Sequence, residues 1–343
     1  MNLKNKITLQ PIFSYKTLIK SLFSRNINNG NSFILNSARS SLEISIDSLL
    51  KNSRKIKQIL LPDFICSEII PIINNFDIPI TFYSIDEHLN PDINFIEDKI
   101  RDKLSIILVV NYFGIPSDWT SLLKLKLKHE CIIIEDNAHS LYGEHDNINF
   151  GNLGDISFNS LRKVLPVLSG SFLQFNININ LSKKIQKRFL NFSEFKYSLR
   201  SFSRKKRNPE KISDCSQSIY DNIESIDYFS YKIYSAQKED RENICRMRKS
   251  NYNFWLKYLS GSELEMLDIK SSICPYAFPC IFNDQRVYDK WVKWGIANNV
   301  NIIKWPLLPK IKSHRLENTK LSNMLLFPVN HMNELNNMKF VNE

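Results

Sequence analysis

Long apolar runs are missing from this chain of 343 residues. Runs such as Leu104 to Val110 are far shorter than the roughly 20 residues that a bilayer-spanning helix needs. The first residues, MNLKNKITLQPIF, are basic and lack both a continuous apolar stretch and a small-residue cleavage site, so they do not resemble a secretory signal. The sequence therefore predicts a cytoplasmic protein with no membrane partner.

Cysteine pairs at metal-binding or redox spacing are also missing. The six cysteines are scattered without a C-x-x-C motif, and Cys131 and Cys280 lie in strand-like apolar contexts. Buried free thiols are the simplest interpretation. The sequence thus predicts neither a disulfide framework nor a metal site.

Glycine is scarce, with 8 residues in the whole chain, whereas lysine, asparagine and isoleucine are used heavily throughout. We attribute the formal net charge of +11 to this compositional bias, although a basic chain can also indicate a nucleic-acid or phosphate partner. The compact basic cluster Arg200 to Arg207 lacks the repeated aromatic residues that favour single-strand binding. We therefore expect no nucleic-acid partner; such a binder would show a steep salt dependence.

The pattern from residue 32 to 176 alternates short apolar runs with helix-length amphipathic segments, which is typical of βαβ units and a mostly parallel sheet. Two domains are expected at this length. The predicted strands are Lys57 to Leu61, Ile78 to Tyr83, Leu104 to Val110, Cys131 to Glu135, Asp155 to Asn159 and Ser171 to Asn176. Helices are predicted to fill the gaps between these strands, notably Ala38 to Leu50, Cys66 to Asn74 and Asp118 to Lys128.

The character of the chain changes beyond residue 176. Residues 177–260 are strongly helical and charged, with an irregular stretch at 195–207. A second α/β alternation follows from Tyr276, with strands at 277–282, 300–304 and 324–329 and a helix at 284–298. We therefore expect an N-terminal segment at 1–31, a large α/β domain at 32–200, a helical connection at 201–260 and a small C-terminal α/β domain at 261–343.

Two reactive side chains follow successive predicted strands. Asp136 ends the run CIIIED, and Lys163 follows DISFNSLR. Ligands of open α/β sheets bind outside the carboxyl ends of the strands, so a carboxylate and an amine are expected together there. Pyridoxal phosphate needs such a pair: a carboxylate that keeps its ring nitrogen protonated and a lysine that forms the imine. The alternatives are a turn cap for Asp136 and a surface lysine for Lys163.

The surroundings of this pair are consistent with the same cofactor. His139 is close enough in sequence to reach its phenolic oxygen or ring face, although a lone histidine is more often an ordinary hydrogen-bonding group. The apolar VLPVL run after Lys163 predicts a poorly solvated amine, and desolvation lowers the pKa of a lysine. Arg162 is either an anion partner or solvent-exposed.

Small hydroxyl residues offer candidate phosphate ligands. Ser157 and Ser160 precede Lys163, and either hydroxyl could bind phosphate. Residues 36–41, at the start of the first predicted helix, offer small side chains and free N–H groups, which suit an anion. N-terminal caps of this kind are common, so this signal is not specific.

Five segments resemble, in order and spacing, the DegT/StrS family of sugar-nucleotide aminotransferases. They are LLPDFIC, VVNYFGIPSDW, IIIEDNAHSLYG, GNLGDISFNSLRK and LLFPVNH. The resemblance covers most of residues 30–176 and returns more faintly at 276–335. It implies the fold type I architecture of pyridoxal-phosphate enzymes and a homodimer.

The resemblance also implies roles for individual residues. Asp136 matches the acid that pairs with the pyridine nitrogen, and His139 matches the residue that contacts the phenolic oxygen. Lys163 matches the cofactor lysine if one residue is inserted here; Arg162 matches without an insertion, but an arginine cannot form the imine. The phosphate-binding turn matches Ser37, Ala38 and Arg39, with Ser40 as a further candidate. The residue that stacks on the cofactor ring falls near Phe64 to Cys66, with Phe64 as the candidate.

The chain departs from the family pattern at two places. The Asp-Gly-Gly that follows the lysine reads Ser169-Gly170-Ser171, which retains the close backbone approach only in part. The Asn-Tyr-Arg motif that reaches the partner subunit's phosphate in the family is not evident between Asp221 and Gln237.

These observations predict a pyridoxal-phosphate-dependent aminotransferase. It would move an amino group from an amino acid, with glutamate the expected donor, to a keto group on a nucleotide-linked sugar for surface polysaccharide or related biosynthesis. Two alternatives remain open: a catalytically degenerate protein of the same fold with a structural or regulatory role, and another sugar-modifying enzyme such as a dehydratase. In the family a histidine replaces the lysine for dehydration, so Lys163 speaks against the dehydratase.

Overall fold

A computed structural model describes residues 6–11, 32–53, 55–187, 223–267, 274–305 and 320–340. The predicted irregular stretch at 195–207 and the basic cluster at 200–207 lie outside these ranges. Within them, no helix combines the length and the apolar character needed to cross a membrane.

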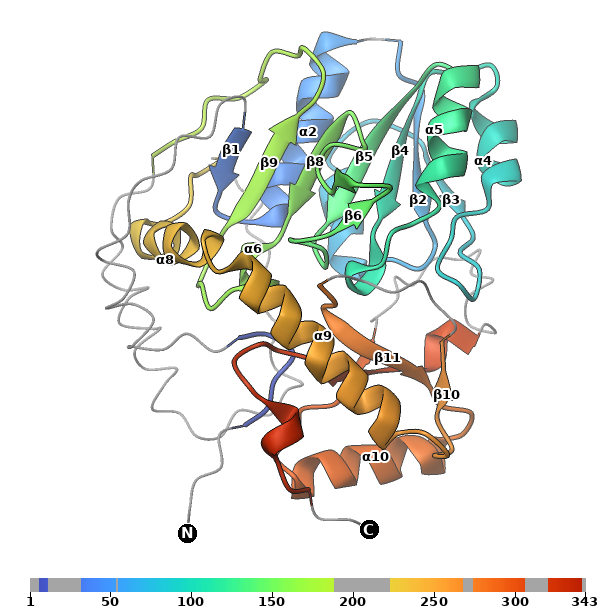
Figure 1. The fold of residues 1–343 in the computed structure, drawn as a ribbon. Coiled ribbons are helices and arrows are strands. Elements are labelled where there is room, and N and C mark those ends of the chain that lie inside the picture. The colour runs from blue at the N-terminus through green and yellow to red at the C-terminus, as the bar shows by residue number, and fades with distance from the viewer. Residues whose placement is uncertain are drawn as a thin grey trace.

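A seven-stranded sheet forms the larger lobe, in the order β1-β9-β8-β5-β4-β2-β3 (Figure 1). Within this sheet β9 runs antiparallel to both of its neighbours, and the remaining pairs are parallel. The predicted mostly parallel α/β sheet is therefore confirmed. Its strands are β1 Ser32–Leu35, β2 Gln58–Pro62, β3 Ile80–Tyr83, β4 Ser105–Val110, β5 Cys131–Asn137, β8 Ile156–Asn159 and β9 Ser171–Phe175.

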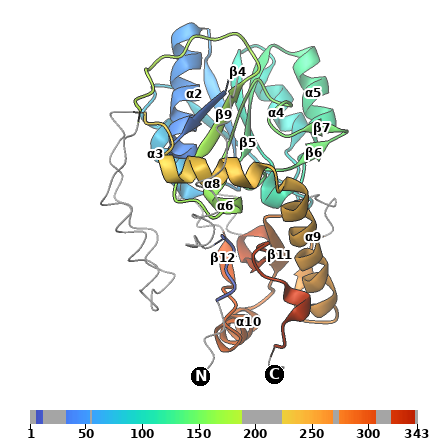
Figure 2. The same cartoon turned by 60° about the vertical axis from the view of Figure 1, so that its left-hand side comes forward.

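Helices cover both faces of this sheet (Figure 2). On one face lie α2 (Ala38–Asn52) and α3 (Ile70–Ile73), and on the other lie α4 (Ile93–Ile100) and α5 (Trp119–Lys128). Alternate residues of a strand point to opposite faces, so a strand covered on both sides is apolar at nearly every position, as β4 is from Ile106 to Val110.

This alternation decides where the acidic end of β5 points. Ile134 packs in the core beneath α2, and Ile133 packs in the core beneath α5. Two residues further along, Asp136 is in phase with Ile134 and faces the α2 side. Glu135 is in phase with Ile133 and faces the α5 side. The two adjacent carboxylates therefore lie on opposite faces of the sheet, in different environments.

A smaller lobe contains an antiparallel sheet in the order β10-β11-β13-β12. The long helix α9 (Arg241–Tyr258) runs from the larger lobe along this sheet (Figure 1). Its Trp255 is fully buried against Phe327 and Trp294, so the helix is part of the core of the smaller lobe. The other elements are β10 Glu265–Met266, β11 Ala277–Ile281, β12 Ile303–Trp305, β13 Met324–Pro328, α8 Tyr228–Lys238 and α10 Gln285–Ala297.

The two lobes share one apolar core. Leu9 from the N-terminal part of the chain, Tyr276 at the start of β11 and Met324 on β13 pack in the same cluster as Phe113 and Trp119 of the larger lobe. Residues 6–11 are held in the smaller lobe by main-chain bonds of 2.9 Å from Ile7 N to Asn299 O and 2.8 Å from Asn301 N to Ile7 O. The N-terminal segment therefore ties the lobes together.

Candidate cofactor site

The carboxyl ends of the parallel strands meet at one edge of the large sheet, and Asp136 lies there on β5. Its side chain is buried and its Oδ1 accepts a hydrogen bond of 2.8 Å from the N–H of Ala138. Burial raises its pKa to about 6, against the opposing effects of the Ala138 N–H and the charge of Lys163. A cation placed beside Asp136 would relieve this cost of a buried charge.

Lys163 lies on α6 (Leu161–Val164), the short helix that follows β8. Burial lowers its pKa, and the charge of Asp136 opposes that shift. The two predicted residues therefore interact electrostatically at the same edge. The Lys163 Nζ also lies 5.9 Å from the centroid of the Tyr276 ring. Arg162, its neighbour in sequence, is exposed.

His139 follows β5 and lies between two aromatic rings. Its imidazole stacks on Tyr276, with centroids 4.6 Å apart and planes 6° apart, and on Phe113 at 5.4 Å and 13°. Burial first, and then the charge of Lys163, hold its pKa well below the ordinary value, so the ring is neutral. Its buried Nδ1 has no hydrogen-bond partner among the described residues. A buried polar atom without a partner is costly, which makes His139 ready for a ligand.

The predicted phosphate turn is the N-terminus of α2. Ser37 caps this helix, accepting a hydrogen bond of 3.1 Å from Ser40 N, and the first turn contains no acidic residue. Ala38 begins the helix, and Arg39 forms a 3.8 Å ion pair with Glu68. This turn lies against the segment after Lys163, because Gly170 N donates a 2.8 Å hydrogen bond to Asn36 O. The N-terminus of a helix with no acidic residue in its first turn favours an anion.

Ser160 and Ser157 lie in different environments. Ser160 is the N-terminal residue before α6, and its hydroxyl does not cap that helix, so it stays a candidate phosphate ligand. Ser157 is paired with Glu135 in the sheet, on the face opposite to Asp136, and its hydroxyl donates a 3.0 Å hydrogen bond to Gly151 O. This places Ser157 away from the other candidates, because a strand alternates its side chains between faces.

Phe64 was predicted to stack on the cofactor ring, but the structure places it elsewhere. Its side chain is fully buried against Tyr112 and Trp305, with ring centroids 5.4 and 5.0 Å away. Cys66, two residues further on, is the residue whose thiol interacts with the charges of both Lys163 and Asp136. Cys66 therefore takes the position beside the reactive pair.

Two further residues reach the site from distant parts of the chain. Tyr276 comes from the smaller lobe and covers one face of His139. Gln10 comes from the N-terminal segment; its side chain is hydrogen-bonded to Tyr276, and its Oε1 accepts a 3.3 Å bond from Arg162. Gln10 thus connects the segment that carries Tyr276 to the helix that carries Lys163. Neither residue lies in a sequence motif that marks a site.

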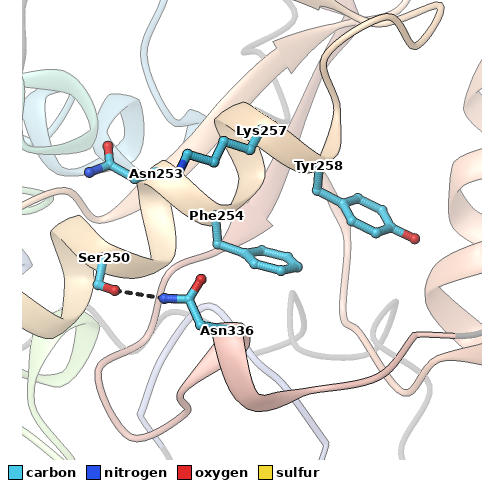
Figure 3. A pocket seen from close by; sticks show the side chains of 6 residues that line it. All are labelled: Ser250, Asn253, Phe254, Lys257, Tyr258 and Asn336. Carbon is cyan, nitrogen blue, oxygen red and sulfur yellow. Dashed lines mark hydrogen bonds between the residues drawn. The ribbon is translucent and has the colours of Figure 1, made fainter.

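An open groove elsewhere in the molecule has a volume of about 500 Å³. It lies along α9 and the turn at 335–337, where Asn336 Nδ2 donates a 3.0 Å hydrogen bond to Ser250 (Figure 3). None of the predicted site residues lines it. The lining side chains are Ser250, Asn253, Phe254, Lys257, Tyr258 and Asn336.

The buried charge of Asp136 predicts a measurable effect on stability. Its pKa is about 6 in the folded chain against an ordinary 3.8. A raised pKa means that the folded chain binds the proton of Asp136 more tightly than the unfolded chain does. The free energy of unfolding is therefore highest below about pH 4, and it falls by about 3 kcal/mol as the pH rises through 6. We expect Asp136→Asn to raise the free energy of unfolding by about that amount near neutral pH, and the difference to vanish in acid.

Urea titrations at several pH values measure this effect. Asp77→Asn, which changes an exposed carboxylate, is the matched control and should leave the free energy of unfolding within about 0.5 kcal/mol of the wild type. An Asp136→Asn variant that is less stable than the wild type at every pH would contradict the assignment of a strained buried charge.

The architecture is fold type I, the fold of a large class of pyridoxal-phosphate enzymes. Residues 19–168 match the sequence model of the DegT/DnrJ/EryC1/StrS aminotransferase family. The resemblance to this family is therefore confirmed over the part of the chain that contains Asp136, His139 and Lys163.

Individual similar proteins are distant. An uncharacterised protein of Methanocaldococcus jannaschii is 26% identical over 166 residues, which are 48% of this chain and 42% of that protein. The chain thus spans less than half the length of this curated relative.

Solved structures share the fold over nearly the whole chain. One is the E. coli GDP-4-keto-6-deoxy-D-mannose-3-dehydratase with bound hydrated PLP, at a TM-score of 0.64 and 15% identity, covering 96% of this chain and 97% of that one. Another is a DegT/DnrJ/EryC1/StrS aminotransferase from Brucella abortus, at a TM-score of 0.63 and 14% identity, covering 92% of this chain and 84% of that one. At this identity the likeness establishes the fold.

Proposed function

We propose that this protein is a pyridoxal-phosphate-dependent aminotransferase that moves an amino group from an amino acid, with glutamate as the donor, to a keto group on a nucleotide-linked sugar. The observation that carries the proposal is the interaction of buried Asp136 with the amine of Lys163, whose pKa burial lowers, at an edge where His139 is neutral. The family match at 19–168 supports the same chemistry.

The side chains present fit this cofactor. Asp136 is a buried carboxylate that a pyridinium proton would stabilise, and the unpartnered Nδ1 of His139 is free to bind the phenolic oxygen. The α2 N-terminus at Ser37 to Arg39, with Ser160, would hold the phosphate. When bound, pyridoxal phosphate supplies an electron sink for the carbon that carries the amino group.

The chain's own contribution is to hold charges and move one proton. Asp136 would hold a proton on the ring nitrogen, because a cation beside this carboxylate relieves the cost of its buried charge. Lys163, whose pKa burial lowers, would hold the cofactor through its amine, and its Nζ would take up and return a proton as the general base and acid. The stack of Phe113, His139 and Tyr276 keeps water from one side of the site.

The remaining parts of the proposal rest on the family resemblance. We expect a homodimer in the cytoplasm, with the basic surface helping to hold the diphosphate of the acceptor and the product entering surface polysaccharide or a related pathway. The departures at Ser169-Gly170-Ser171 and the missing Asn-Tyr-Arg element favour a second candidate, a protein of this fold that binds the cofactor without turnover.

An absorbance titration with pyridoxal phosphate, followed by addition of glutamate, tests the proposal. We expect a visible band that forms on addition of the cofactor and bleaches on addition of glutamate. Lys124→Ala, which changes an exposed lysine on α5, should behave like the wild type. A band that persists with glutamate and with every other amino acid favours binding without turnover, whereas the absence of a band rules out the cofactor assignment.

A further inference from the structure

A pair of thiols lies outside the cofactor site, between α9 and the segment that enters β11. Cys245 is half-buried on the second turn of α9, and Cys274 is buried two residues before Tyr276. The two thiols are hydrogen-bonded to each other. Residues almost 30 positions apart are thus brought together by the packing of α9 on this segment.

Arg248 fixes this packing independently of the thiols. It lies one turn after Cys245 on α9 and is fully buried. Its NH1 donates hydrogen bonds of 3.2 Å to Pro275 O and 3.4 Å to Tyr276 O, and its NH2 donates one of 3.0 Å to Val164 O. The residue directly after Cys274 is therefore clamped to the helix that carries Cys245.

The surroundings of the pair shift the pKa values of the two thiols in opposite directions. The hydrogen bond from Cys274 first, and then the guanidinium groups of Arg241 and Arg248, hold the pKa of Cys245 below its ordinary value against the effect of burial. The same thiol–thiol bond and burial raise the pKa of Cys274. Arg241 is also hydrogen-bonded to Cys245 and lies over the Tyr142 ring, 5.7 Å from its centroid.

The buried guanidinium of Arg248 also favours a thiolate at Cys245. All the hydrogen bonds it makes within the described ranges go to main-chain carbonyl oxygens, and its Nε has no partner there. A buried cation that lacks a carboxylate favours an anion nearby. A thiolate at Cys245 would supply that anion. The arrangement matches the electropositive, partly exposed setting of reactive cysteines.

We propose that Cys245 and Cys274 form a peroxide-sensitive dithiol, a modification site separate from the cofactor site and independent of the proposed function. The Cys245 thiolate attacks one oxygen of a hydroperoxide and breaks the O–O bond, forming a sulfenic acid and releasing water, or an alcohol from an organic peroxide, after protonation. The Cys274 sulfur then attacks the sulfenic sulfur, forming the S–S bond and releasing a second water. Two thiols lose two electrons and two protons in total, and the peroxide gains them.

The other described cysteines outside this pair lack the lowered pKa of Cys245. Burial raises the pKa of Cys131 to about 11 and raises that of Cys280 further, and Cys66 also has a raised pKa because of burial. Each is therefore a poorer nucleophile toward peroxide.

A bond between Cys245 and Cys274 would act on the segment that carries Tyr276. That ring stacks on His139, and the main-chain carbonyl of Tyr276 already accepts from Arg248. The bond would cross-link α9 to the chain two residues before this ring. Oxidation would therefore restrain one wall of the site without touching Lys163 or Asp136.

Peptide mapping of the reduced full-length protein after brief exposure to hydrogen peroxide tests the proposal. We expect alkylatable thiols to fall from the six of the sequence to four, together with a peptide pair joined through Cys245 and Cys274 that lacks two hydrogens. Cys274→Ser should stop at a sulfenic acid on Cys245 that dimedone traps, and Cys245→Ser should leave Cys274 unmodified. Cys280→Ser is the matched control and should form the pair at the wild-type rate.

The reaction rate supplies the discriminating outcome. Cys245 should react with peroxide at least about tenfold faster than Cys131 or Cys280, as its lower pKa implies. The proposal is overturned if dimedone labels another cysteine first, if the linked peptide joins a different pair, or if six thiols remain. The wild-type measurements decide the question even if a serine variant fails to fold.

Discussion

Replacing Lys163 with alanine is expected to abolish the visible band with pyridoxal phosphate and to reduce amino-group transfer by about 10³-fold or more. A lysine that both attaches the cofactor and moves the proton has no substitute nearby, since Arg162 cannot form an imine. Borohydride treatment followed by peptide mapping measures the attachment directly, because it makes the bond to the lysine permanent. We expect the modified peptide to carry the cofactor at position 163.

A double variant tests the register of the motif. In Lys163→Ala with Arg162→Lys, a lysine occupies the position that matches the family without an insertion. Arg162 is exposed and directed to Gln10, so a lysine there should not restore the band. Recovery of the band in the double variant, with borohydride labelling at position 162, would show that the insertion has been placed wrongly. Lys124→Ala again serves as the control.

Glu135→Ala is expected to destabilise the folded chain by about 4 kcal/mol. Glu135 is fully buried, and its two carboxylate oxygens accept hydrogen bonds from the N–H groups of Gly151, Leu153 and Gly154, at 2.9, 3.2 and 3.2 Å. Asn137 donates a further bond of 2.8 Å. Removing the acceptor would leave several buried donors unpaired, at about 1 to 3 kcal/mol each before relaxation.

The geometry leaves little room for the loop at 149–155 to compensate. A Cβ on Gly154 would lie 2.9 Å from the Cβ of Glu135 and 3.0 Å from Ile133 O, so this loop is packed tightly against β5. Urea unfolding measures the free energy. Glu135→Gln, which keeps the shape and one acceptor, should lose about half as much, and exposed Glu130→Ala should lose under about 0.5 kcal/mol. A loss below about 1 kcal/mol for Glu135→Ala would contradict this role.

The large sheet could be predicted from the sequence because its central strands are buried on both faces. β4 from Ile106 onward and the first four residues of β5 are continuous apolar runs, a pattern that length and flanking residues separate from a helix. The strand β1 was not predicted, since its four residues, Ser32–Leu35, are defined by antiparallel pairing with β9. Helix α4 fills one of the gaps in which a helix was predicted, but its bounds were not predicted, since it begins at an Asp92 cap within a polar stretch.

The site could be predicted only where its residues follow strands. Asp136, His139 and Lys163 lie at strand ends, and parallel strands end at a common edge. Tyr276 and Gln10 reach the same place through the packing of one lobe on the other, which no local pattern records. Phe64 and Cys66 differ by two positions in a turn, and motif spacing alone does not say which one lies beside the reactive pair.

The position of residues 6–11 has a consequence for how the chain is made. Ile7 pairs with residues 299 and 301, and Leu9 packs in the same cluster as Met324, so these residues are synthesised long before the partners that hold them. Contacts of such sequence separation form late and slowly. Until then Leu9 and the apolar edge beneath Tyr276 stay uncovered. We therefore expect nascent chains that stop before β11 to need chaperone protection and to fail to assemble the larger lobe as a stable fragment.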